Sequence, residues 1–343
     1  MAFVEPVQPV IPEGAISARE NYHRVFEKGK PAWFPTTHDM LFFNPAILPD
    51  NIARGMVNEA RQPEPGYEGG PDMFGINWTW VPETMGSMVY GGHPALEDAN
   101  DWEKVIRFPD MEQWDWEGCA KRNAGIYFDT NRPSCINVVS GLFERLISFM
   151  DMQYALMALV DADQKDAVKR LFDRLTVFYD QLFEHLHRYF HTDVVQFHDD
   201  WGSKKAPLFS LDTCMEMVEP YLEKVVKSAH RHGMIFEFHC CGKNELLVSA
   251  MYKANIDIWN GQPLNDFDSL IPVYGDKIVF GVSPEPLPAY VADEEAWESG
   301  HRFVEKYIHF YDEGKPVAVF SRRSNAKQIE SIYHYSREAL SRR

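Results

Sequence analysis

The sequence predicts an α/β protein built as a (β/α)8, or TIM, barrel. Eight short apolar runs recur along the chain, each ending in polar residues or glycine, and segments with helical periodicity separate them. The runs are rich in β-branched and aromatic residues and are continuous rather than alternating, as expected of parallel strands covered on both faces. Alternating strands and helices favour a parallel sheet, and eight strands suggest that the sheet closes into a barrel.

The expected elements follow one another along the whole chain. The clearest helix spans 212–232, with Asp212 as its N-cap, basic residues in its last turn and Gly233 after its end. Residues 142–191 have room for two helices that break near 161–163. The apolar runs place the eight strands at 31–37, 73–77, 135–140, 193–198, 234–240, 256–260, 277–283 and 316–321.

Two segments lie outside this repeating pattern. Residues 1–30 are expected to form an N-terminal extension whose helical part, 16–28, covers the bottom or side of the barrel. Residues 31–343 are expected to form a single catalytic barrel domain. The connection after the second strand, 79–132, is unusually long and carries several tryptophans, and such connections are usually functional lids or coverings.

The composition is that of a globular protein of enzyme size. The chain has 343 residues, of which 45% are hydrophobic, so it can bury a large core. Lys and Arg total 34 against 51 Asp and Glu, and the net charge of −17 argues against nucleic acid or a membrane as a partner. Five cysteines without disulfide-framework spacing, and a start that does not resemble a signal sequence, favour the cytoplasm.

The triplet His239-Cys240-Cys241 is the most informative feature, and Gly242 follows it. In an extended strand successive side chains alternate, so His239 and Cys241 project to one face and Cys240 to the other. An imidazole and a thiolate are two of the ligands that zinc prefers, and the glycine lets the chain turn away. The alternative is that both cysteines are small buried hydrophobes and the histidine is a hydrogen-bonded core residue.

A second polar cluster, His198-Asp199-Asp200, ends the expected strand 193–198. In barrels of this type the chemistry belongs at the carboxyl ends of the strands, so these three residues are candidate catalytic residues. His198 and Asp200 share one face, and Asp199 takes the other. Either carboxylate could ligate a metal, orient His239 or act as a general acid or base. Equally, either could be a helix N-terminal charge or part of a loop ion pair.

Other strand ends supply further candidates. Glu285 lies in a proline-flanked loop after strand 277–283; a rigid loop suits a metal ligand, although prolines also simply end strands. Aromatic side chains near strand ends could form a flat apolar pocket, with packing under a lid as the alternative. The candidate substrate-binding residues are Trp78, Phe143, Trp201, Asn260 and Gln262.

The order of these motifs resembles the uroporphyrinogen decarboxylase superfamily, and within it the branch of corrinoid-dependent, metal-using methyltransferases. The resemblance spans nearly the whole chain and is most specific at the His-Cys-Cys-Gly motif. It implies a (β/α)8 barrel, the fold that the strand count predicts independently. The stretches that carry it are 18–21, 30–35, 194–202, 239–242, 256–263 and 277–281.

The chain departs from two patterns known in that superfamily. The decarboxylases carry an arginine-rich motif after the first strand that grips the substrate's propionates, whereas residues 36–39 here read Thr-Thr-His-Asp. The thiol methyltransferases use His-x-Cys with a distant cysteine near strand eight, whereas residues 319–323 read Val-Phe-Ser-Arg-Arg. Oxygen from Asp199, Asp200 or Glu285 would then complete a harder site.

The resemblance therefore implies the zinc-dependent methyltransferase component of an O-demethylase system. Such an enzyme moves a methyl group from a small methoxylated aromatic compound to the cobalt of a corrinoid (cobalamin) that a separate protein carries. Zinc would draw electron density from the ether oxygen and improve the phenolate as a leaving group. Amines and methanol stay open as methyl donors. The alternatives are methyl transfer from a methylcorrinoid to a thiol coenzyme and a non-catalytic binding or scaffold barrel.

Overall fold

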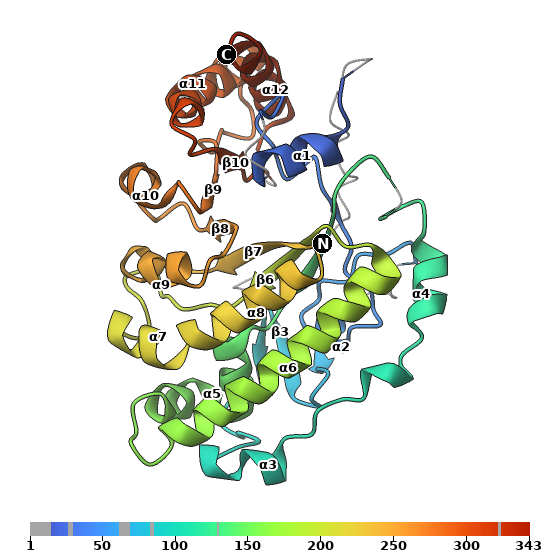
Figure 1. The fold of residues 1–343 in the computed structure, drawn as a ribbon, viewed down its shortest axis with the longest axis vertical. Helices are drawn as coiled ribbons and strands as arrows, with labels where there is room; N and C mark the ends of the chain where they lie inside the picture. The colour runs from blue at the N-terminus through green and yellow to red at the C-terminus, as the bar shows by residue number, and fades with distance from the viewer. Residues whose placement is uncertain (1–14, 27–29, 62–68, 83–85, 129, 322–323) are drawn as a thin grey trace.

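The computed structural model describes residues 15–26, 30–61, 69–82, 86–128, 130–321 and 324–343. Within these ranges seven parallel strands form one sheet, and helices pack around it (Figure 1). The predicted α/β class and parallel sheet are confirmed. The strands lie in the order β1 (Leu41–Phe42), β5 (Ser134–Val138), β6 (Val194–His198), β7 (Ile235–Cys240), β8 (Ile258–Gly261), β9 (Val279–Val282) and β10 (Val317–Val319).

The first expected strand, 31–37, is reduced to one bridge between Thr36 and Val319 of β10. The N–H of Thr37 donates to Val319 O at 3.0 Å, and the N–H of Val319 donates to Pro35 O at 2.7 Å. The strand prediction was wrong here because Pro35 has no N–H to give to a ladder. The same segment leads on into β1, so it joins the two edges of the seven-stranded sheet.

The prediction of a second strand at 73–77 is also wrong, because these residues form a turn around the side chain of Asp72. Asp72 Oδ1 accepts the N–H groups of Phe74 at 2.8 Å and Ile76 at 2.9 Å, which holds the backbone in a turn. The chain becomes extended only at β3 (Asn77–Val81), in a separate antiparallel sheet with β2 (Gly70–Pro71) and β4 (Gly86–Val89). The long insertion therefore follows β1 and occupies 43–133.

The insertion also contains α2 (Pro49–Ala53), α3 (Trp102–Val105) and α4 (Trp116–Asn123). It packs against the outside of α6 (Lys165–Phe190), beside which α4 lies in Figure 1. The indole of Trp116 is buried there, with ring centroids 6.0 Å from Tyr189 and 5.7 Å from Phe190. This tryptophan therefore belongs to the packing of the insertion on α6.

The two helices expected within 142–191 are α5 (Leu142–Ala158) and α6, so that prediction is confirmed. The helix expected at 212–232 is divided into α7 (Leu211–Met217) and α8 (Glu219–Arg231), because Pro220 cannot continue the hydrogen-bond ladder of α7. Ser210, not Asp212, is the N-cap that accepts from Thr213 N. The other outer helices are α9 (Val248–Lys253), α10 (Phe267–Tyr274), α11 (Asp293–Asp312) and α12 (Ala326–Ser341).

α1 (Ala18–Phe26) is the described part of the expected helix 16–28, whose last residues lie outside the described ranges. Tyr22 and Val25 pack with the side chains that begin the strands, among them Ile235, Ile258 and Val279. The helix therefore covers the amino-terminal end of the sheet. The carboxyl ends of the strands meet at the opposite end, where the polar strand ends gather.

Candidate metal centre

β6 and β7 lie side by side and end at the same edge of the sheet. Their register pairs His198 with His239, and the two imidazole centroids are 4.6 Å apart. Side chains alternate along a strand, so Gln196 shares the face of His198 and Glu237 shares the face of His239. Gln196 and Glu237 are both buried and hydrogen-bond each other across the strands. The two histidines thus continue a buried polar row toward the carboxyl edge.

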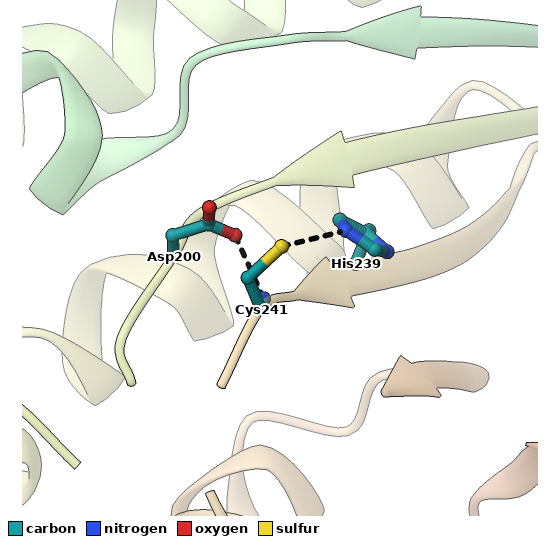
Figure 2. A group of neighbouring side chains, drawn as sticks. All are labelled: Asp200, His239 and Cys241. Atoms are coloured by element: carbon teal, nitrogen blue, oxygen red, sulfur yellow. Dashed lines mark hydrogen bonds between the residues drawn. The ribbon is translucent and has the colours of Figure 1, made fainter. Parts of the chain in front are cut away.

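Asp200 and Cys241 lie two residues beyond the histidine pair, on the same face. Their side chains converge with that of His239 into a group of three metal-ligand side chains (Figure 2). The ligand atoms of Asp200, His239 and Cys241 all lie within 4.8 Å of one another. Cys241 Sγ is 3.4 Å from His239 Nε2. All three side chains are half-buried, which leaves a ligand access to them. Nitrogen, sulfur and oxygen donors in this arrangement form a candidate metal centre.

Close contact between two glycines fixes the loops that carry these ligands. Gly242 has φ +92°, and a Cβ atom on it would lie 2.2 Å from the carbonyl carbon of Gly202. The N–H of Lys243 donates to Ser203 O at 2.8 Å in the same contact. Only glycine accepts both the left-handed backbone and this approach. The glycine of the His-Cys-Cys-Gly motif therefore locks the loop after β7 onto the loop after β6.

The donor set fits zinc. Zinc takes His, Cys and Asp ligands, and three protein ligands with one open position are typical of catalytic zinc. Burial, followed by the charge of Asp200, raises the pKa of the Cys241 thiol well above its ordinary value. The thiol alone is therefore neutral at physiological pH, and a bound cation would stabilise the thiolate. His239, Cys241 and Asp200 are the residues that would hold the ion.

The structure does not bring Glu285 to this group. Its carboxylate accepts hydrogen bonds from Ser299 at 2.9 Å and Arg302 at 3.0 Å, on the neighbouring α11. The hydrogen bond from Arg302 is the largest cause that lowers the pKa of Glu285. Its side chain is 57% exposed. Glu285 therefore takes part in a surface ion pair, and Asp200 supplies the oxygen donor of the cluster instead.

Cys240 lies on the opposite face from Cys241, as strand alternation predicts. Its side chain is fully buried, and its Sγ lies 3.2 Å from the N–H of Trp201 and 3.1 Å from Asn244 Nδ2. Burial raises the pKa of this thiol well above its ordinary value. Cys240 is thus a packed, hydrogen-bonded core residue.

Asp199 also points away from the cluster and caps α5. Its carboxylate accepts the N–H groups of Phe143 at 3.1 Å and Glu144 at 2.8 Å, and Trp201 Nε1–H at 3.0 Å. Burial raises the pKa of Asp199 to about 6, and these hydrogen bonds oppose the rise. Asp199 is therefore a negative charge at the N-terminus of a helix, which was the alternative to a role as metal ligand or catalytic acid. His198 stays beside the cluster, with its Nε2 3.1 Å from Gln196 Oε1.

The two candidate amides lie at different depths. Gln262 Nε2 is 3.4 Å from Cys241 Sγ, and Gln262 Oε1 accepts the N–H of Gly242 at 2.9 Å. Gln262 therefore orients the cysteine of the cluster. Asn260 is buried one step deeper, where its Nδ2 donates to Glu237 Oε1 at 2.7 Å.

Two of the three candidate aromatic residues are core residues. Phe143 and Trp201 are fully buried. Phe143 packs edge-on against Phe209 with ring centroids 5.0 Å apart, and Trp201 packs at a tilt against Phe238 with centroids 4.8 Å apart. Neither presents a surface to a ligand. Trp78 is 6% exposed, and its ring lies 4.4 Å from the guanidinium of Arg54.

Arg54 and Glu144 form a largely buried ion pair. Arg54 Nη1 and Nη2 both donate to Glu144 Oε1 at 3.3 Å, and Nη1 also donates to Ser140 Oγ at 3.3 Å. Burial raises the pKa of Glu144 well above its ordinary value; Arg54 opposes the rise, and the charge of Asp200 adds to it. Glu144 follows a predicted strand end, and this position in the sequence could have indicated a site residue. No feature of the sequence around Arg54 indicates that it pairs with Glu144.

Comparisons with known proteins give no family. No family model matches the chain, and no curated protein matches it. Solved structures that it resembles include a sugar phosphate isomerase/epimerase from Parabacteroides distasonis, with 8% sequence identity and a TM-score of 0.35. That match covers 70% of this chain and 79% of the other, and it assigns no activity. None of the helices in the described ranges is both long and apolar enough to cross a membrane.

Proposed function

We propose that this chain is a zinc-dependent methyltransferase that takes a methyl group from a methoxylated aromatic compound. The acceptor is the cobalt of a corrinoid that a separate protein carries. The observation that supports the proposal most directly is the convergence of Asp200, His239 and Cys241 at the carboxyl edge of β6 and β7. The resemblance of the sequence motifs to corrinoid-dependent methyltransferases supplies the reaction class.

The identity of the third donor favours an ether substrate over a thiol. A site with two thiolates suits activation of a thiol coenzyme, and the sequence has no cysteine near β10 to supply the second one. Asp200 provides a carboxylate oxygen in its place. An ion held by one thiolate, one imidazole and one carboxylate is a harder Lewis acid, and it suits an oxygen ligand.

The reaction balances without an outside oxidant or reductant. The bond between methyl and ether oxygen breaks, a bond between methyl and cobalt(I) forms with the cobalt electron pair, and the phenolate keeps the other pair. When bound, zinc supplies Lewis-acid polarisation of the ether oxygen. Two hydrogen bonds hold the ligands in place: the backbone N–H of Cys241 donates to Asp200, and the side-chain amide of Gln262 donates to the sulfur of Cys241. Arg54 contacts both Glu144 and Trp78, and the charges of Arg54 and Glu144 act on Cys241.

The test combines metal analysis with a transfer assay. Purified protein should contain about one zinc per chain and should methylate cob(I)alamin from methoxyarenes, with release of the phenol. Asp200→Asn should abolish transfer, whereas Glu285→Gln, which changes an acid outside the cluster, should leave it unchanged. A zinc-loaded protein that transfers no methyl from any aromatic ether, with or without a corrinoid protein, would overturn the proposal. A protein without zinc would favour the scaffold alternative.

A further inference from the structure

The loop after β8 reaches the metal cluster through two amide side chains. Gln262 follows that strand directly and contacts both Cys241 Sγ and the N–H of Gly242. Asn265 is 5% exposed, and its side chain bonds to the loop after β7. The loops after β6 and β7 carry the candidate ligands, so the loop after β8 is a third component of this site.

Asn265 bonds to three backbone groups with one side chain. Its Oδ1 accepts the N–H of Asn244 at 2.8 Å, and its Nδ2 donates to Gly242 O at 3.0 Å and to Gln262 O at 2.9 Å. The position requires an acceptor on one side and a donor on the other, which an amide provides and a carboxylate does not. Asn265 therefore ties the loop after β7 to the loop after β8.

Every polar group of Cys241 has a neighbour that holds it. Its N–H donates to Asp200 Oδ1 at 2.7 Å, its carbonyl accepts Asn244 Nδ2 at 2.7 Å, and its Sγ lies 3.4 Å from Gln262 Nε2. Asn265 bonds to the backbone of both Asn244 and Gln262, so it supports two of these three contacts. Loss of the Asn265 side chain would therefore loosen Cys241 from two directions.

We propose that Asn265 is a positioning residue of the metal centre, which fixes the sulfur of Cys241 for the ion without being a ligand itself. This inference rests on the metal centre of the proposed function and extends it to a residue behind the ligands. Residues that orient metal ligands raise the metal affinity, because the ligands lose less freedom when the ion binds. They also set the direction from which the sulfur meets the ion.

Zinc competition against a chromophoric chelator, on the full chain without corrinoid, measures this effect apart from catalysis. Asn265→Ala removes all three bonds, and the zinc affinity should fall about tenfold to a hundredfold. Asn21→Ala is the matched control. Asn21 is 1% exposed, and its side chain also makes three bonds to backbone groups, those of Ala32 and Trp33 at the opposite end of the sheet. Its loss should lower the melting temperature similarly and leave the zinc affinity unchanged.

Cobalt(II) in place of zinc reports the position of the sulfur directly. Ligation by Cys241 gives a thiolate-to-cobalt charge-transfer band, whose intensity depends on the overlap of sulfur and metal orbitals. The band should weaken in Asn265→Ala and match wild type in Asn21→Ala. Asn265→Asp keeps the acceptor for the N–H of Asn244 and loses both donors, so it should also weaken the band and the zinc affinity. It gives a second reading that does not depend on the folding of the alanine variant.

Wild-type zinc affinity and an unchanged cobalt band in either folded Asn265 variant would overturn the inference. An equal loss in Asn21→Ala would overturn it too, because general destabilisation would then explain the effect. Wild-type protein that binds no zinc would refute the metal centre and this inference with it. Zinc affinity that depends on Asn265 in a protein that transfers no methyl would refute the proposed function alone. Methyl transfer by a protein whose Asn265 variants bind zinc normally would refute this inference alone.

Discussion

The backbone N–H of Cys241 donates a 2.7 Å hydrogen bond to Asp200 Oδ1. This bond joins the residue after β7 to the second residue after β6, so two of the candidate metal ligands are already tied together by the backbone (Figure 2). This hydrogen bond fixes the plane of the Asp200 carboxylate, so the position of its second oxygen, Oδ2, is fixed as well. A site built this way would lose little freedom on binding an ion, and this would favour tight binding.

We expect about one zinc per chain, held by Asp200, His239 and Cys241. His239→Ala combined with Cys241→Ala removes two of three donors, and metal content after dialysis should fall below about a tenth of wild type. Plasma mass spectrometry of the dialysed proteins measures it. Cys240→Ser should keep its zinc, because Cys240 faces the core, although burial of a hydroxyl there should lower the melting temperature. Full zinc occupancy in the double variant would show that the ion binds elsewhere.

Gln262 should affect metal affinity without touching the ion. Its amide contacts Cys241 Sγ and its carbonyl holds the N–H of Gly242, so Gln262→Leu frees the ligand loop. Loss of such an orienting partner typically weakens metal binding about tenfold to a hundredfold. Competition for zinc against a chromophoric chelator measures the change. Unaltered affinity in a folded variant would mean that the glycine contact alone orders the loop.

Local sequence pattern predicted two of the three candidate metal ligands, His239 and Cys241. It left the oxygen donor open among Asp199, Asp200 and Glu285, and the structure brings only Asp200 to the group. His239 and Cys241 share a face because strand alternation spaces them two residues apart, and Asp200 shares a face with His198 for the same reason. The register between β6 and β7 then brings the two pairs together. The position of Glu285 was not predictable in this way, because its pairing with Arg302 depends on where α11 lies.

Burial and long-range pairing were not predictable in the same way. The indole of Trp201 looks available at a strand end, yet the carboxylate of Asp199 and the ring of Phe238 enclose it. Arg54 meets Glu144 across 90 positions of sequence, and a single sequence carries no signal for such a pair. The missing first strand had a local cause, since Pro35 cannot donate to a ladder.

The cap of α5 should contribute strongly to stability. Asp199 is fully buried and accepts two backbone N–H groups and one indole N–H, so Asp199→Ala leaves three donors without a partner. The free energy of unfolding should fall by on the order of 2–4 kcal/mol. Urea unfolding measures it. Asp212→Ala is the matched control: Asp212 is exposed and is not the cap of α7, so its loss should cost less than about 0.5 kcal/mol. Equal effects of both substitutions would contradict the capping role.

His230 at the end of α8 should make stability depend on pH. Its Nε2 lies 2.7 Å from Asp257 Oδ2, and this hydrogen bond raises the pKa of His230. Because the folded pKa lies above the unfolded value of about 6.5, the stabilisation is fully present below that pH and is lost as pH rises through the folded pKa. The ring is 33% exposed, so the effect is screened to about 0.5 kcal/mol. The difference in unfolding free energy between wild type and His230→Gln should therefore be larger at pH 5.5 than at pH 9. Asp257→Asn should remove the same pH-dependent part, and a difference that grows toward alkaline pH would contradict the pairing.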